Sequence, residues 1–130
     1  MICNKCLKDK PLEDYYKNKL NSTGYLYSCI LCIKEYQLSR KRENKNLYLK
    51  ANYNIDIEIF EKMLKDQNYK CAICKKLQND LKSPLCVDHC HINGNIRGLL
   101  CTNCNHALGK FNDNIDILLE AIKYLKINEK

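Results

Sequence analysis

Apolar residues recur at helical spacing in two stretches of the chain. In residues 53–70 they fall on one helical face: Ile55, Ile59, Phe60, Met63 and Leu64. Asp56 suits the N-cap of this helix, because its carboxylate can accept hydrogen bonds from the first free backbone N–H groups. The pattern predicts a core helix in residues 53–70.

A second apolar stripe in residues 110–130 predicts the last helix, with these members: Ile115, Leu118, Leu119, Ile122 and Leu125. Asp113 or Asn114 suits its N-cap. We expect this helix to pack on the helix in residues 53–70 and over the segment that separates the two.

That separating segment has a different pattern. Residues 85–89 alternate enough to predict a short strand, and residues 95–100 predict its return strand. Asn93-Gly94 between them is a strong hairpin signal, since both residue types tolerate a positive φ. Residues 101–109 begin a helix, and Gly109 suits its C-cap. The order of strand, turn, strand and helix predicts a ββα unit.

The most basic stretch of the chain is residues 34–52, which contain neither Gly nor Pro and predict a helix or a helical linker. A run of charge is typical of a solvated helix face, and here it is equally typical of a track for nucleic-acid phosphates. The candidate phosphate contacts are Arg40, Lys41, Arg42 and Lys45.

The chain has ten cysteines, and eight of them form four Cys-x-x-Cys pairs. This spacing favours metal knuckles over a disulfide framework, so we expect two structural zinc ions. The expected ligands are Cys3, Cys6, Cys29 and Cys32 in one site, and Cys71, Cys74, Cys101 and Cys104 in the other. The organisation that follows is a zinc ribbon in residues 1–35, a basic helical linker in residues 36–52 and a second domain in residues 53–130.

The formal net charge is +7. Eight thiolates and two zinc ions would reduce it to about +3, so the net charge argues only weakly for nucleic acid. Neither a signal peptide nor an apolar run of about 18 residues is visible in the sequence. Together with thiols kept for zinc, this predicts a soluble intracellular protein that is not secreted and has no membrane partner.

Asp88, His89, His91 and Asn105 lie beside the second cysteine group and add a different chemistry. A carboxylate and an amide oxygen suit a Mg²⁺ ion that keeps most of its waters. A histidine suits a general base that activates water for phosphodiester hydrolysis. Because adjacent strand residues point to opposite faces, Asp88 and His89 can act together only if the strand ends or twists there.

These residues carry a resemblance to a known family. The segments in question are Asp88-His89-x-His91, then Gly94-Asn-Ile-Arg-Gly-Leu-Leu-Cys-x-x-Cys-Asn105, Leu108-Gly109 and Ala121-Ile-x-Tyr-Leu125. They resemble the recombination endonuclease VII family, phage-type Holliday-junction resolvases within the HNH, or ββα-metal, nucleases. The resemblance covers roughly residues 55–126, and residues 1–35 resemble the zinc-ribbon extension of many phage versions.

The resemblance implies an α+β fold: a small zinc-stapled ββα-metal (HNH, or His-Me finger) nuclease core with flanking helices and an N-terminal zinc ribbon. It implies that His89 is the general base, that Asp88 and Asn105 bind a catalytic Mg²⁺ or Mn²⁺, and that His91 contacts the scissile phosphate. The implied partner is DNA, and the junction resolvases of the family suggest branched DNA and a homodimer. The family leans toward viruses, so the expected compartment is the cytoplasm of a bacterium, or the host cell of a virus.

Two other functions stay open. An HNH nicking or homing-type endonuclease would cut linear duplex DNA as a monomer. A zinc-ribbon module would bind nucleic acid without catalysis, although such a module has no need of Asp88, His89 and Asn105 together. Arg97 is expected either to contact a phosphate or to brace the hairpin. His106 is expected to face solvent.

Overall fold

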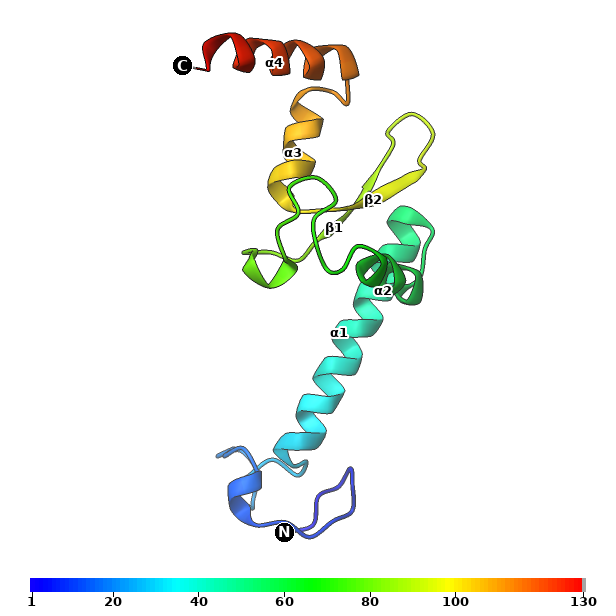
Figure 1. The fold of residues 1–130 in the computed structure, drawn as a ribbon. Coiled ribbons are helices and arrows are strands. Elements are labelled where there is room, and N and C mark those ends of the chain that lie inside the picture. The colour runs from blue at the N-terminus through cyan, green and yellow to red at the C-terminus, as the bar shows by residue number, and fades with distance from the viewer. Residues whose placement is uncertain (130) are drawn as a thin grey trace. The chain divides into compact units, whose positions relative to one another are not determined.

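The computed structural model describes residues 1–129. The chain forms two compact units, Met1–Asn52 and Tyr53–Lys130. Figure 1 shows the order of the helices and strands along the chain. The first two cysteine pairs belong to the first unit and the other two pairs belong to the second.

The first unit is built around its cysteines. Its core around the cysteines consists of the buried residues Cys3, Tyr15 and Cys29, with Met1, Cys6, Tyr25 and Cys32 packed partly against them. Its regular elements are a 3-10 helix, η1 (Leu12–Asp14), and the helix α1 (Ile30–Tyr53), whose last residue begins the second unit. An apolar core this small cannot stabilise a fold without a further staple.

In the second unit, α2 (Ile57–Asp66) supplies the largest apolar side chain of the core. Asp56 caps α2 as expected, since its carboxylate accepts a hydrogen bond from the Ile59 N–H (2.9 Å). The buried face consists of Ile57, Phe60 and Leu64. The expectation that Ile59 lies on this face is wrong: it is 45% exposed. Position 59 lies roughly 200° around the helix from Ile57, on the opposite side.

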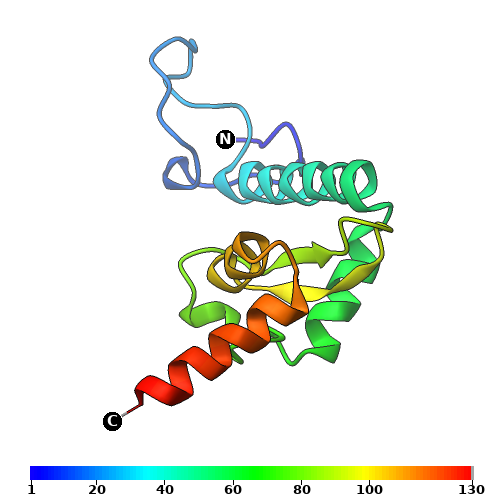
Figure 2. The same ribbon diagram turned by 90° about the horizontal axis from the view of Figure 1, so that it is seen from above.

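The strands β1 (Cys86–His89) and β2 (Ile96–Leu100) form an antiparallel pair, and α3 (Thr102–Lys110) packs against both. Figures 1 and 2 show this predicted ββα unit from two directions. In the turn, Gly94 has a φ of +73°, and the Cys90 N–H donates to the Asn95 carbonyl (2.8 Å). A short 3-10 helix, η2 (Gln78–Asp80), lies in the loop before β1.

The pairing of the two strands contains a β-bulge. Asp88 pairs with Gly98, and the next residue, His89, pairs with Ile96. Arg97 is therefore an extra residue on β2, opposite the step between Asp88 and His89. A bulge bends the strand that carries the extra residue and increases its twist, so the side chains of β2 do not simply alternate at Arg97.

Gln67, at the C-terminal end of α2, holds the free edge of β2. Its side-chain oxygen accepts a hydrogen bond from the Leu99 N–H (2.8 Å), and its amide nitrogen donates to the Leu99 carbonyl (2.9 Å). The same nitrogen donates to the Lys70 carbonyl (2.8 Å). Gly98 permits this approach, because a Cβ there would lie 3.2 Å from the Gln67 oxygen.

The last helix, α4 (Ile115–Asn128), begins at the expected cap, where the Asn114 side chain accepts a hydrogen bond from the Ile117 N–H (3.1 Å). The expectation that its apolar stripe packs on α2 and the ββα unit is wrong. None of the residues of α4 is buried, and Ile115 and Leu125 are 71% and 62% exposed. In Figure 1, α4 extends beyond α3 on the side away from α2.

No helix within residues 1–129 has both the length and the apolar content needed to cross a membrane.

Candidate functional site

Each of the two groups of four cysteines brings its sulfur atoms within 4.8 Å of one another. The Sγ atoms of Cys3 and Cys32 lie 3.9 Å apart, and those of Cys74 and Cys101 lie 3.8 Å apart. A tetrahedral zinc ion with Zn–S bonds of about 2.3 Å separates its sulfurs by roughly 3.8 Å. Both groups therefore have the chemistry and the dimensions of a structural zinc site. Their members are the expected ones: Cys3, Cys6, Cys29 and Cys32, and Cys71, Cys74, Cys101 and Cys104.

The first knuckle of each group has the same backbone turn. Leu7 and Lys75, which each follow the second cysteine of their pair, have φ angles of +58° and +62°. The N–H of Leu7 donates to the Cys3 carbonyl (2.9 Å), and the N–H of Lys75 donates to the Cys71 carbonyl (3.1 Å). This turn reverses the chain and brings the two sulfurs of a pair to one metal position.

In each group, backbone hydrogen bonds lower the pKa of one thiol. A backbone N–H of Cys6, followed by those of Cys29 and Lys5, lowers the pKa of Cys3 to about 6. Burial raises the pKa of Cys71, but the backbone N–H groups of Cys101, Cys74 and Ile73 outweigh it and bring the value to about 6. Zinc binds thiolates, and the lowered pKa favours the thiolate form of Cys3 and Cys71.

A cleft of about 430 Å³ lies at the ββα unit and gathers most of the remaining candidate residues. It is lined by Asp88, His91, Arg97, Asn105, His106, Gly109, Lys110 and Asp113. Asp88 comes from β1, Asn105 comes from α3, and Asp113 comes from the turn after α3. The cleft thus brings together two predicted ligands that are 17 positions apart in the sequence.

This cleft contains side-chain oxygens of the kind that hard divalent cations bind. Asp88 is only 6% exposed, and it is the one buried charged residue within residues 1–129. A buried carboxylate requires a cation or hydrogen-bond donors to offset its desolvation. The half-buried Asn105 adds an amide oxygen, and the open side of the cleft leaves room for the waters that Mg²⁺ retains.

Arg97 forms a bidentate ion pair with Asp88. Its Nε donates to Asp88 Oδ2 (2.7 Å), and its Nη2 donates to Asp88 Oδ1 (2.9 Å). Nη2 also donates to both carboxylate oxygens of Asp113, each at 3.2 Å. The hydrogen bonds to Asp88, then those to Asp113, raise the pKa of Arg97 above its ordinary value.

His89 ends β1 immediately after the bulge and does not line the cleft itself. Its ring centroid lies 4.8 Å from that of His91, which does line the cleft, and 5.4 Å from that of Tyr53, which it meets edge to face. His89 is therefore held between Tyr53 and His91 at the border of the cleft. A water between the His89 ring and the cleft would have an imidazole within reach, as general-base catalysis requires.

Residues 46–127 match the family model described as recombination endonuclease VII. The chain belongs to the recombination endonuclease VII family. The Gene 59 proteins of Mycobacterium phages D29 and L5 are each 35% identical to it, over 99 and 98 residues, respectively. These alignments cover 75% of this chain but 59% of each relative, so the chain spans about three fifths of their length.

Among solved structures, the chain is similar to the ββα-Me type II restriction endonuclease Hpy99I. The TM-score is 0.44 with 28% sequence identity, and the match covers 98% of this chain and 65% of that chain.

The part of this endonuclease VII family member that matches the family model includes the second cysteine group and all four candidate active-site residues. The first cysteine group lies outside it. The same holds for the expected phosphate contacts on α1: Arg40, Lys41, Arg42 and Lys45. In the first unit, Arg40 pairs with Glu43 (3.1 Å), and both side chains are more than half exposed.

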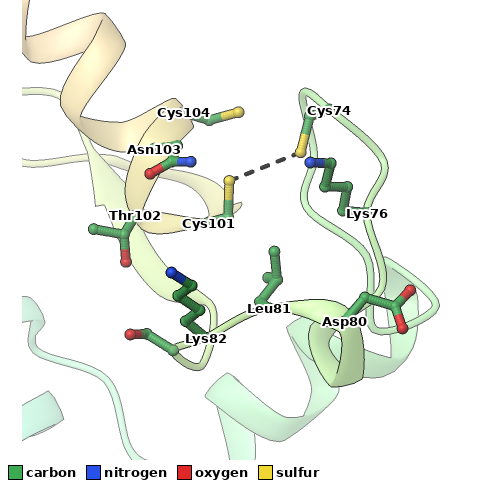
Figure 3. A pocket seen from close by; sticks show the side chains of 10 residues that line it. Cys74, Lys76, Asp80, Leu81, Lys82, Cys101, Thr102, Asn103 and Cys104 are labelled. Carbon is green, nitrogen blue, oxygen red and sulfur yellow. Dashed lines mark hydrogen bonds between the residues drawn. The ribbon is translucent and has the colours of Figure 1, made fainter.

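A larger cleft, of about 550 Å³, adjoins the second cysteine group. Figure 3 shows Cys74, Lys76 and Asp80 on one side of it, and Thr102, Asn103 and Cys104 on the other. It contains no histidine, and its acid, Asp80, is exposed. None of the four candidate active-site residues lines it, so the smaller cleft at Asp88 is the candidate reaction site.

Sequence reasoning did not find Asp113 or Tyr53 as parts of the site. Asp113 was considered only as a helix cap, and Asn114 takes that role. The sequence signal for a turn at Asp113 is the run Asn112-Asp113-Asn114, because residues of these types tolerate the positive φ that Asn112 and Asp113 have (51° and 53°).

His106 lines the cleft while remaining exposed. Cys86 and Cys90 belong to neither cysteine group.

Proposed function

We propose that the chain is a metal-dependent DNA endonuclease that hydrolyses phosphodiester bonds, with branched DNA as its preferred substrate. The observation that carries this proposal is the cleft that joins Asp88 of β1 to Asn105 of α3. It lies within the residues that match the recombination endonuclease VII family. A non-catalytic binding module would have no use for a buried carboxylate and an amide oxygen in one cleft.

In this proposal Asp88 and Asn105 hold one Mg²⁺ or Mn²⁺ ion through their side-chain oxygens. When bound, such an ion stabilises the negative charge that develops on the phosphate and the leaving oxygen. The two cysteine groups hold structural zinc ions. Cys101 and Cys104 flank the start of α3, so the second zinc ion fixes the helix that carries Asn105.

His89 is the general base that takes a proton from the attacking water. Its position next to His91 supports this role, because the two rings lie 4.8 Å apart at the border of the cleft. His91 lines the cleft and contacts the scissile phosphate.

Basic side chains contact the DNA phosphates in this proposal: Arg97 in the cleft, and Arg40, Lys41, Arg42 and Lys45 on α1. Symmetric cutting of a four-way junction requires two active sites, so the proposal includes a homodimer as the junction-cutting form.

The test is cleavage of a four-way DNA junction beside a linear duplex of the same sequence. Both substrates are incubated with the zinc-loaded protein and Mg²⁺, with the same protein without added Mg²⁺, and with the His89→Ala variant and Mg²⁺. We expect Mg²⁺-dependent cutting that favours the junction, and we expect at least a hundredfold lower rate for His89→Ala, as is typical when a general base is removed.

Equal nicking of both substrates would replace branched DNA with linear duplex DNA and favour an HNH nicking enzyme. Full activity of His89→Ala would reject His89 as the base. A zinc-loaded, folded protein that binds both DNAs but cuts neither would reject the nuclease and favour the zinc-ribbon binding module.

A further inference from the structure

Arg97 has two acidic partners in the cleft, and they bind it differently. Asp88 takes two donors, Nε and Nη2, at 2.7 and 2.9 Å. Asp113 takes Nη2 alone, through two longer contacts of 3.2 Å. Asp88 is the same carboxylate that the proposed endonuclease uses for its divalent cation. Arg97 and the cation therefore need the same two oxygens.

The backbone holds Arg97 and Asp113 in these positions. Arg97 is the extra residue of the bulge, so its side chain is free of the regular alternation of β2. Asp113 follows Asn112 in a turn where both residues have a positive φ, and its own N–H donates to the Leu108 carbonyl (3.0 Å). Asn and Asp adopt this left-handed conformation readily, and the hydrogen bond to Leu108 fixes the Asp113 backbone at the end of α3.

The charges of the cleft suit a site that takes a cation at Asp88 and an anion at Arg97. Its charged lining residues are two acids, Asp88 and Asp113, and two bases, Arg97 and Lys110. These charges cancel, so a bound divalent cation would give the cleft a net positive charge that suits an anionic phosphodiester. Within residues 1–129, Nη1 of Arg97 makes no hydrogen bond, which leaves two N–H donors for such a ligand.

We propose that Asp113 is a positioning residue that retains Arg97 in the cleft when the catalytic cation takes the Asp88 carboxylate. Arg97 then exchanges its bonds to Asp88 for bonds to the DNA phosphate beside the cation, while Asp113 keeps hold of Nη2. Without Asp113, Arg97 would pair with Asp88 alone and would compete more strongly with the cation. This inference rests on the proposed function, because it assumes that Asp88 and Asn105 bind a divalent cation.

The exchange predicts opposite effects of two substitutions on cation binding in the absence of DNA. Asp113→Asn should weaken Mn²⁺ binding by about threefold to tenfold, because it replaces a charge-assisted partner of Arg97 with a neutral one. Arg97→Gln should strengthen it by a similar factor, because it removes the competitor. Asn tolerates a positive φ as well as Asp does, so the turn at position 113 is preserved.

The experiment is titration of zinc-loaded protein with Mn²⁺, with free Mn²⁺ measured by electron paramagnetic resonance. Two charge-matched controls accompany the variants. Asp116→Asn removes an acid outside the cleft, and Lys110→Gln removes a base that lines the cleft but bonds to neither Asp88 nor Asp113. We expect both controls to stay within about twofold of the wild type, since a non-bonded charge near the surface is strongly screened. Zinc content and thermal unfolding are measured for every variant.

The two ideas can fail separately. If the wild type binds one Mn²⁺ and Asn105→Ala abolishes this binding, the proposed metal site holds. An unchanged affinity in Asp113→Asn, or a weaker one in Arg97→Gln, would then overturn the partner exchange alone. An effect of Lys110→Gln as large as that of Arg97→Gln would also overturn it in favour of general electrostatics. A wild type without Mn²⁺ binding would overturn both.

Discussion

Gln67 gives the free edge of β2 the hydrogen bonds that a third strand would supply. It both donates to and accepts from the backbone of Leu99, which is fully buried. Its remaining donor reaches Lys70, so the whole amide group is used. A two-stranded hairpin is marginally stable by itself, and this single side chain ties it to α2.

We expect Gln67→Ala to lower the free energy of unfolding of the zinc-loaded protein by about 1–3 kcal/mol, because it leaves the buried Leu99 N–H without a partner. Chemical denaturation followed by circular dichroism measures the change. Gln37→Ala, at an exposed position of α1, is the control and should change the value by less than about 0.5 kcal/mol. Equal effects of the two substitutions would mean that the Gln67 hydrogen bonds do not stabilise the fold.

The side chains that sequence reasoning identified are those whose chemistry is unusual at their position. Asp88 and Asn105 stand out because a carboxylate and an amide adjoin a cysteine motif, and both do line one cleft. Gln67 and Asp113 are ordinary polar residues near turns, and their roles depend on partners 32 and 16 positions away. No local pattern specifies such partners, so these roles required the three-dimensional arrangement.

At the scale of elements, the first Cys-x-x-Cys knuckle of each cysteine group has the same turn and one thiol with a lowered pKa. The pKa values of Cys3 and Cys71, both about 6, lie below the ordinary 9.0. A thiolate with a lowered pKa stabilises the folded state fully above the ordinary value, and this stabilisation is lost as the pH falls toward the lowered value. Protons therefore compete with zinc in the same pH range at both groups.

This equivalence predicts how zinc is released. We expect both zinc ions to be retained at neutral pH and to be lost over the same range of acid pH, with loss of the folded signal. Measurement of bound zinc after dialysis at a series of pH values, in parallel with circular dichroism, tests this. Release of one ion at a clearly higher pH than the other would show that the two groups are not equivalent.

Local signals predicted most of the elements well. Asp56 and Asn114 cap their helices, and the Asn93-Gly94 turn joins the two strands, because each signal acts within a few residues. The packing of α4 was predicted wrongly. Its periodicity defines an apolar stripe but does not specify a partner for it, and the stripe is exposed. The bulge at Arg97 was also not predictable, since it arises from the register between two strands.

In the molecule as a whole, the candidate reaction cleft and the densest run of positive charge lie in different units. The cleft with Asp88 belongs to the second unit, and α1 carries the basic run of the first. If α1 holds DNA through its phosphates, its contribution must appear in the salt dependence of binding and not in the chemical step.

We therefore predict that a variant with Arg40, Lys41, Arg42 and Lys45 replaced by Gln binds duplex DNA more weakly and with a shallower salt dependence. The slope of log K against log salt should decrease by about 0.9 for each replaced residue that contacts a phosphate. Fluorescence anisotropy with labelled DNA, in Ca²⁺ to prevent cleavage, measures the slope. The ion pair between Arg40 and Glu43 does not prevent this role, because an exposed pair contributes little stability and can exchange partners.

The control removes basic side chains from the second unit, away from the cleft, by Lys62→Gln and Lys65→Gln in α2. We expect a smaller change of slope per residue in this control. The α1 variant should keep its zinc and, at saturating DNA, its Mg²⁺-dependent cleavage rate, because the groups proposed to react all lie in the second unit. A slope equal to that of the wild type would mean that the charges of α1 form a solvated helix face. A lower cleavage rate than that of the wild type at saturating DNA would mean that α1 also contributes to the geometry of the reaction. The two measurements together therefore separate a role of α1 in binding DNA from a role in cutting it.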